Sequence, residues 1–160
     1  MSLESIMRRV YPKEENCMAC RLCEVGCTVE HSKSKDVLEA YLVEKPRVFA
    51  HTSVEVEPTE SFSRQCRHCV DAPCVDACMN GAMHKDPITG AIRINQDKCV
   101  GCWMCIMTCP YGVIKPDIEN KKVASKCDLC VESGFPECVA NCPNEAIILV
   151  DEKGEKVDSK

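Results

Sequence analysis

Residues 99 to 110 read Cys-Val-Gly-Cys-Trp-Met-Cys-Ile-Met-Thr-Cys-Pro, so Cys99, Cys102, Cys105 and Cys109 follow the spacing C-x2-C-x2-C-x3-C-P. Three thiolates two residues apart wrap a tight loop around one iron–sulfur cubane, each binding a different iron. The fourth thiolate points away from that cubane, and in this spacing it binds a second cluster. The run therefore predicts one [4Fe–4S] cluster here and a partner run elsewhere in the chain.

Three further groups of four cysteines complete the set of sixteen. They keep the first and last gaps of the run and differ only in the middle gap, which is two, four or seven residues long. Their members are Cys17, Cys20, Cys23 and Cys27; Cys66, Cys69, Cys74 and Cys78; and Cys127, Cys130, Cys138 and Cys142. Four groups of four thiolates are the ligand set of four [4Fe–4S] clusters.

Two other uses of sixteen cysteines fit this sequence less well. A disulfide scaffold needs an oxidising compartment, and the N-terminus lacks the apolar stretch and cleavage site of a secretory signal. A structural zinc site uses two C-x2-C pairs to close one tetrahedron, so the third and fourth cysteines of each run would be superfluous. We therefore expect reduced thiols that bind iron, in a cytoplasmic protein.

The composition limits both the core and the partners. Aromatic residues make up only 4% of the 160 residues, so a core of large side chains would be thin. We expect the clusters to fill it and the iron-free chain to be unstable. The formal charge of −5, to which the clusters add, argues against nucleic-acid binding through a basic patch. No apolar run approaches about 18 residues, so we expect a soluble protein without a membrane span.

The pattern predicts an α+β fold of small elements, with two bacterial-ferredoxin-like two-cluster units in one compact chain around a cluster-dominated core. We expect a hairpin over 82–94, a helix over 34–43 capped by Ser34, and a strand over 47–57. The single domain, 1–160, then divides into an outer unit (about 1–27 plus 120–150), an inserted cover segment (28–61), an inner unit (62–118) and a flexible tail (151–160). The alternative role of the insert is a docking surface for a partner.

Four groups can pair in three ways. The second and third groups are adjacent and share a spacer with the expected hairpin, which favours pairing them and leaves the first and fourth to pair across the chain. With the fourth cysteines exchanged, the predicted sets are Cys66, Cys69 and Cys74 with Cys109; Cys99, Cys102 and Cys105 with Cys78; Cys17, Cys20 and Cys23 with Cys142; and Cys127, Cys130 and Cys138 with Cys27. His68, inside a ligand loop, is expected to tune a cluster through a hydrogen bond.

The four-group layout resembles the polyferredoxin subunits of multi-subunit oxidoreductases, such as formate dehydrogenases, dimethyl sulfoxide reductases and hydrogenases. In that family the first group also pairs with the fourth and the second with the third. Three stretches look closest to the iron–sulfur subunit of anaerobic nickel carbon monoxide dehydrogenase, and the resemblance covers about residues 6 to 150. They are Cys-Arg-Leu-Cys-Glu-Val-Gly-Cys-Thr-Val-Glu-His-Ser (20–32), Gln-Cys-Arg-His-Cys-Val-Asp-Ala-Pro-Cys (65–74) and the run from Cys99 extended to Gly112.

This resemblance implies an electron-transfer subunit that is not catalytic alone. Electrons would pass from carbon monoxide dehydrogenase through four [4Fe–4S] clusters to a flavin-containing NAD(P) oxidoreductase, a hydrogenase or a ferredoxin. A formate dehydrogenase, an aldehyde oxidoreductase or a hydrogenase is the alternative partner, and a redox-sensing protein is the alternative of a different class. The sequence has no nucleophile triad and no glycine-rich phosphate loop that would indicate chemistry on a substrate.

Overall fold

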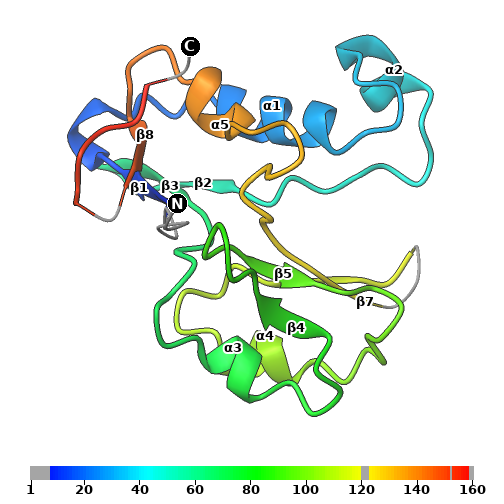
Figure 1. Ribbon diagram of the computed structural model, residues 1–160. Coiled ribbons are helices and arrows are strands. Elements are labelled where there is room, and N and C mark those ends of the chain that lie inside the picture. Colours follow the sequence, from blue (N-terminus) through cyan, green and yellow to red (C-terminus); the bar gives the residue numbers. More distant parts are fainter. Residues whose placement is uncertain (1–7, 120–122, 152, 159–160) are drawn as a thin grey trace.

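Short helices alternate with two-stranded antiparallel sheets along the chain (Figure 1). The computed structural model describes residues 8–119, 123–151 and 153–158. The helices are α1 (Leu22–Glu30), α2 (Val37–Leu42), α3 (Pro73–Asp76), α4 (Met104–Thr108), α5 (Glu137–Ala140) and the 3-10 helix η1 (Glu14–Asn16). The strands are β1 (Arg9–Pro12), β2 (Ser53–Val56), β3 (Ser61–Arg64), β4 (Met83–Lys85), β5 (Ile92–Ile94), β6 (Lys115–Asp117), β7 (Val123–Ser125) and β8 (Ile147–Val150). The prediction of a mixed fold of small elements is confirmed.

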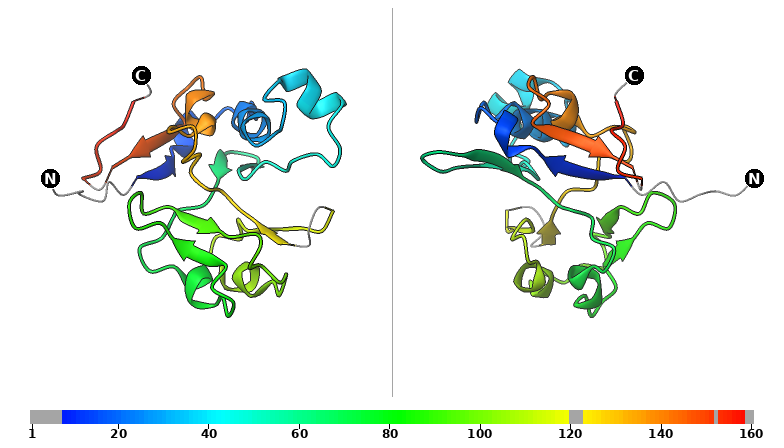
Figure 2. Two further views of the ribbon diagram at one scale, coloured as in Figure 1. Left: turned by 45° about the vertical axis from the view of Figure 1, so that its right-hand side comes forward. Right: turned by 90° about the vertical axis from the view of Figure 1, so that its left-hand side faces the viewer.

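One of the sheets joins segments from opposite ends of the sequence. Strand β1 pairs with β8, and Val10 lies opposite Leu149 in the register. Both side chains are almost fully buried, so this contact stabilises the pairing through apolar burial. The other three sheets pair β2 with β3, β4 with β5, and β6 with β7. Figure 2 shows β1 (blue) and β8 (orange to red) side by side.

The predicted hairpin over 82–94 is confirmed. Strands β4 and β5 pair with Met83 opposite Ile94. The turn between them is fixed by Asp86, whose Oδ1 accepts hydrogen bonds from the backbone N–H of Ile88 (2.8 Å) and Thr89 (3.1 Å). An aspartate side chain that binds backbone two residues ahead is a usual way to close such a turn.

Two hydrophobic cores contain both apolar and cysteine side chains. One core lies around β4, β5, α3 and α4, in the lower half of Figure 1, and includes Ile92, Cys74 and Cys105. The other lies around β1, β8, α1 and α5, in the upper half, and includes Leu149 and Cys138. Cysteines thus occupy positions that large aliphatic residues fill in most domains.

Two local expectations differ from the structure. Asp36, not Ser34, caps α2, because its Oδ1 accepts from the N–H groups of Leu38 (2.9 Å) and Glu39 (3.0 Å). The extended pattern over 47–57 yields only the strand β2, and residues 47–52 pair with no strand in the described ranges.

Part of the segment expected as a flexible tail, residues 153–158, contacts the second core. It turns back along β8, where the N–H of Val157 donates to the carbonyl of Leu149 at 2.8 Å, and Val157 packs against the second core. The charged composition of this segment gave no sign of that contact, which depends on the tertiary fold.

Candidate metal centres

Twelve of the sixteen cysteines line three cavities, four to a cavity, in groups that correspond to three of the predicted sets. All sixteen lie in the described ranges, and none forms a disulfide there. We call the sets site A (Cys17, Cys20, Cys23, Cys142), site B (Cys27, Cys127, Cys130, Cys138), site C (Cys66, Cys69, Cys74, Cys109) and site D (Cys78, Cys99, Cys102, Cys105). That these particular thiols hold iron remains a prediction.

Sites C and D each surround an apolar cavity in the first core. The four thiols of site C line one cavity together with Ile92, Val113 and Ile114. Those of site D line another together with Met83 and Ile94. Helices α3 and α4 pack against each other and place one cysteine of each site, Cys74 and Cys105, on a helix. Cys109 follows Cys105 in sequence but lines the cavity of the other site.

Site A has the same construction in the second core. Its four thiols line a cavity with Val54, Ser63 and Ile147. The hydroxyl of Ser63 lies 3.7 Å from the sulfur of Cys23, and the N–H of Ala146 donates to the sulfur of Cys142 at 3.2 Å. Polar groups thus contact the sulfur atoms within an otherwise apolar wall.

Site B lies at the packed pair of helices α1 and α5. Helix α1 carries Cys23 of site A one turn before Cys27 of site B, and α5 carries Cys138 just before Cys142 of site A. Burial raises the pKa of the Cys138 thiol well above its usual value, and repulsion from Cys127, Cys27 and Cys130 adds to the rise. Cys138 is thus within electrostatic range of the three other thiols of site B and of Cys23 in site A.

All four cysteine groups share one backbone turn. The residue before the second cysteine has a positive φ in every group: Ala19 (56°), His68 (44°), Gly101 (68°) and Leu129 (65°). This conformation costs a non-glycine residue of the order of 1 kcal/mol or more. Of the four residues, only Gly101 is of a type that predicts a positive φ from the sequence. The repeated conformation curls each loop so that its cysteines face one centre.

Sequence reasoning missed a polar network around Cys27. The sulfur of Cys27 accepts the N–H of His51 at 3.2 Å, and His31 Nδ1 lies 3.9 Å from the same sulfur. The His31 ring donates from Nδ1 to the Cys27 carbonyl (2.8 Å) and from Nε2 to Asp128 (3.0 Å), which requires the protonated ring. Residues 31 and 128 are far apart in sequence, and no local pattern connects them.

The pKa of the Cys27 thiol differs from the pKa values of other buried thiols. Burial raises the pKa of Cys74 to about 11 and that of Cys130 to about 12. Burial acts in the same direction at Cys27, but hydrogen bonds from His31 and His51 outweigh it and bring its pKa to about 6. Metal binding needs thiolates, so iron must displace protons from the thiols whose pKa is raised. Cys27, with its lowered pKa, is already mainly a thiolate at neutral pH.

His68, which lies in the ligand loop of site C, is buried. Only 1% of it is exposed, its Nδ1 accepts the N–H of Ile92 at 2.9 Å, and its Nε2 has no partner among the described residues. In a neutral ring whose Nδ1 is the acceptor, Nε2 carries the hydrogen. This N–H donor lies in the loop of site C, but His68 does not line the cavity of that site, and its hydrogen bond to a cluster stays a prediction.

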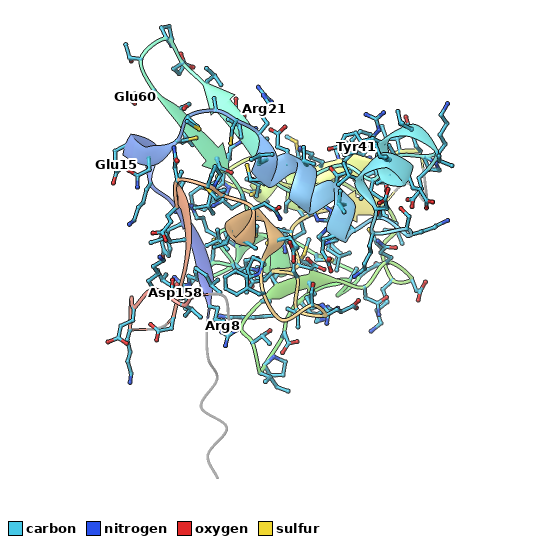
Figure 3. The ribbon with its side chains drawn as sticks, turned by 90° about the horizontal axis from the view of Figure 1, so that it is seen from above. Arg8, Glu15, Arg21, Tyr41, Glu60 and Asp158 are labelled. Carbon is cyan, nitrogen blue, oxygen red and sulfur yellow. The ribbon has the colours of Figure 1, made fainter. Side chains whose placement is uncertain are left out.

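An acidic groove lies beside site A. Its lining includes Cys17 and four glutamates, which are Glu14, Glu15, Glu57 and Glu60. Figure 3 shows Glu15 and Glu60 at the same end of the molecule. Separately, none of the helices in the described part of the chain is long and apolar enough to cross a membrane.

The donor sets fit iron–sulfur clusters. Each set supplies four free thiols, and in sites A, C and D they surround a single cavity with an apolar wall. Thiolate ligands in an apolar surrounding, with N–H groups directed at sulfur, are the usual setting of a [4Fe–4S] cluster.

Comparisons with known proteins agree with this chemistry. A family described as "4Fe-4S dicluster domain" matches residues 58–154. An "Iron-sulfur protein" of Rhodospirillum rubrum is 37% identical over 157 residues, covering 89% of this chain and 81% of the relative. "Electron transport protein HydN" of Escherichia coli K12 is 37% identical, covering 90% of this chain and 88% of the relative. "Putative oxidoreductase AegA" of the same strain is 36% identical over 89% of this chain, which spans 22% of that longer protein.

The family match covers more than half of the chain, and the first two relatives extend it over most of the remainder. The residues outside the match include the first cysteine group, so the matched segment alone does not contain all sixteen thiols. With that group included, the cysteines suffice for four clusters. The chain therefore belongs to the 4Fe-4S dicluster domain family and binds [4Fe–4S] clusters.

Proposed function

We propose that this iron–sulfur electron-transfer protein is a wire of four [4Fe–4S] clusters held in the order A, B, C, D. When bound, the clusters supply one-electron transfer. Two charge interactions and one shared core support the order. Cys23 of site A acts on the charge of Cys138 in site B, Cys66 of site C acts on Cys127 in site B, and sites C and D share one core. Sites A and B would form the outer two-cluster unit and sites C and D the inner one.

The exposure of the cysteines carries the proposal. Of the sixteen, all within the described ranges, Cys20 and Cys102 alone are exposed. They belong to sites A and D, the two ends of the proposed order, whereas site B has three buried cysteines and site C two. A wire needs access for partners at its ends and exclusion of water between them. A structural or single-site role would not require two accessible ends.

Residues of the chain shield the cluster cavities from water and place hydrogen-bond donors at the cysteine sulfur atoms. Apolar side chains such as Ile92, Val113 and Ile147 wall the cavities against water, and backbone N–H groups face the sulfur atoms. Hydrogen bonds to sulfur and exclusion of solvent are the means by which a protein sets cluster potentials. Reduced thiols persist in the cytoplasm, which is where we place the protein.

We infer that the electron donor is a nickel carbon monoxide dehydrogenase. The proposal is supported by the resemblance of residues 20–32, 65–74 and 99–112 to the iron–sulfur subunit that serves those enzymes. The acceptor would be a flavin NAD(P) oxidoreductase, a hydrogenase or a ferredoxin. The name "Electron transport protein" of one relative and the oxidoreductase name of another support a partner of the oxidoreductase class. A formate dehydrogenase or aldehyde oxidoreductase is the alternative donor.

Reduction by carbon monoxide tests the donor. In an anaerobic mixture of reconstituted protein with a catalytic amount of nickel carbon monoxide dehydrogenase, carbon monoxide should rapidly bleach most of the iron–sulfur absorbance. A formate dehydrogenase with formate serves as the matched control and should bleach it far more slowly. Bleaching by formate dehydrogenase alone would replace the donor. Absence of bleaching by either enzyme, while dithionite still reduces the clusters, would remove both donors and keep the wire.

A further inference from the structure

A buried lysine lies at the boundary between the two cores. Lys126 is 5% exposed and immediately precedes Cys127 of site B. Its ammonium group donates hydrogen bonds to two backbone carbonyls, those of Cys127 and Ile92. Ile92 lies in β5 and lines the cavity of site C. The cation is therefore held between the polypeptide of one site and the wall of the next.

The peptide groups of Ile92 connect this cation to the ligand loop of site C. Its carbonyl accepts from Lys126, while its N–H donates to Nδ1 of His68 at 2.9 Å. His68 lies between Cys66 and Cys69. Ile92 and His68 are each 1% exposed, so the whole chain of hydrogen bonds is shielded from water. A displacement of Lys126 would therefore alter hydrogen bonds at both site B and site C.

No carboxylate forms an ion pair with Lys126 within the ranges that the structure describes. A buried cation with carbonyl partners only is costly unless negative charge lies nearby. The charge of Lys126 acts on Cys74 of site C and Cys127 of site B, where it opposes the rise in thiol pKa that burial causes. Asp128 and Arg9 are the other charges that face His68 in this region. Asp128 is already bound to His31.

We propose that Lys126 is the counter-charge of the clusters at sites B and C, and that it stabilises an electron on either of them. The inference rests on the proposed wire. A [4Fe–4S] cluster with four thiolates gains one negative charge on reduction, and a nearby buried cation favours that change. An electron that crossed from B to C would oxidise one cluster by one electron and reduce the other by one, with no bond or proton exchanged.

The position of Lys126 offsets the electrostatic cost of reducing the two buried clusters, those of sites B and C. Exclusion of water disfavours added negative charge, so the middle clusters would otherwise be harder to reduce than the ends. A single cation between them lowers that cost for both. The cation therefore brings the reduction potentials of sites B and C closer to those of sites A and D. It does not favour electron transfer in either direction between B and C. Lys126 is a positioning and charge-compensating residue, since it ligates no iron in this scheme.

Three variants separate charge from shape. Lys126→Gln keeps a donor for a carbonyl but removes the charge, and Lys126→Arg keeps the charge. Lys115→Gln is the matched control, because Lys115 also donates to a backbone carbonyl, that of Ala50 at 3.1 Å, from β6 outside this boundary. The readout is an EPR-monitored potentiometric titration, in which Cys20→Ser and Cys102→Ser backgrounds identify the signals of sites A and D.

In Lys126→Gln we expect the ratio of reduced to oxidised cluster at fixed potential to fall about tenfold at sites B and C. That corresponds to a downward shift of about 59 mV for a one-electron couple. Sites A and D should stay unchanged, as should all four sites in Lys126→Arg and Lys115→Gln. Unchanged potentials in Lys126→Gln with full iron, or an equal shift at all four sites, would overturn the proposal.

The unmodified protein supplies a second test if Lys126→Gln fails to hold iron. During stepwise reduction, sites B and C should fill no later than sites A and D. Filling of both end sites before either middle site would overturn the role of Lys126. Failure of the wire itself has a different signature, because clusters that do not titrate reversibly in the unmodified protein would give no filling order at all.

Discussion

Anaerobic removal of iron should abolish the cooperative thermal unfolding of this protein. Both hydrophobic cores are built partly from cysteines that point toward shared centres, and aromatic residues make up only 4% of the chain. Without iron, the cavities of sites A, C and D lose their filling, and sulfur atoms brought together at each site repel one another once ionised.

The size of the effect follows from metal-linked folding. A structural metal held by thiolates and imidazoles contributes on the order of 10 kcal/mol in zinc-finger peptides. The net stability of a whole domain is only about 5–15 kcal/mol. Loss of several clusters should therefore unfold the chain outright at 25 °C.

Calorimetry and near-ultraviolet circular dichroism before and after chelation give the measurement. Reconstitution with iron and sulfide should restore the transition, which controls for irreversible damage by the chelator. An iron-free protein with a cooperative, native-like transition would show that the apolar residues alone suffice.

Replacement of Cys109 by Ala should damage the cluster of site C and spare that of site D. By sequence Cys109 belongs with Cys99, Cys102 and Cys105, but its thiol lines the cavity of Cys66, Cys69 and Cys74. The matched control is Cys105→Ala, which removes a ligand of the same sequence group from site D.

Double variants test whether Cys109 binds the cluster of site C or the cluster of its own sequence group. Cys66→Ala with Cys109→Ala should affect no more clusters than either change alone, about one quarter of the iron by Mössbauer spectroscopy. Cys105→Ala with Cys109→Ala should affect about half of the iron, because the two ligands serve different clusters. The reverse pattern would mean that each group of four holds its own cluster.

The spacing of the cysteines predicted more of this molecule than any other feature. It predicted four sets of thiols, of which three line a shared cavity each, because ligand spacing is a local property that the chain carries in its order. The hairpin over 82–94 was equally accessible, since Asp86 and Gly90 mark its turn.

The remaining features depend on contacts that no local pattern encodes. The bond between His31 and Asp128 joins residues far apart in sequence, and the burial of Lys126 follows from the packing of one core against the other. The positive φ at Ala19 and Leu129 contradicts their residue types and is imposed by the shape of the loop. Such strain at a predicted ligand site is the usual place for local preference to fail.

The number of electrons that the protein accepts tests the wire most directly. Coulometry of the anaerobically reconstituted protein, with iron and sulfide measured on the same sample, should give about four electrons per chain, one for each cluster. The uptake should be reversible and lie at low potential. About two electrons or fewer with a full complement of iron, or uptake that does not reverse, would contradict a wire of four clusters.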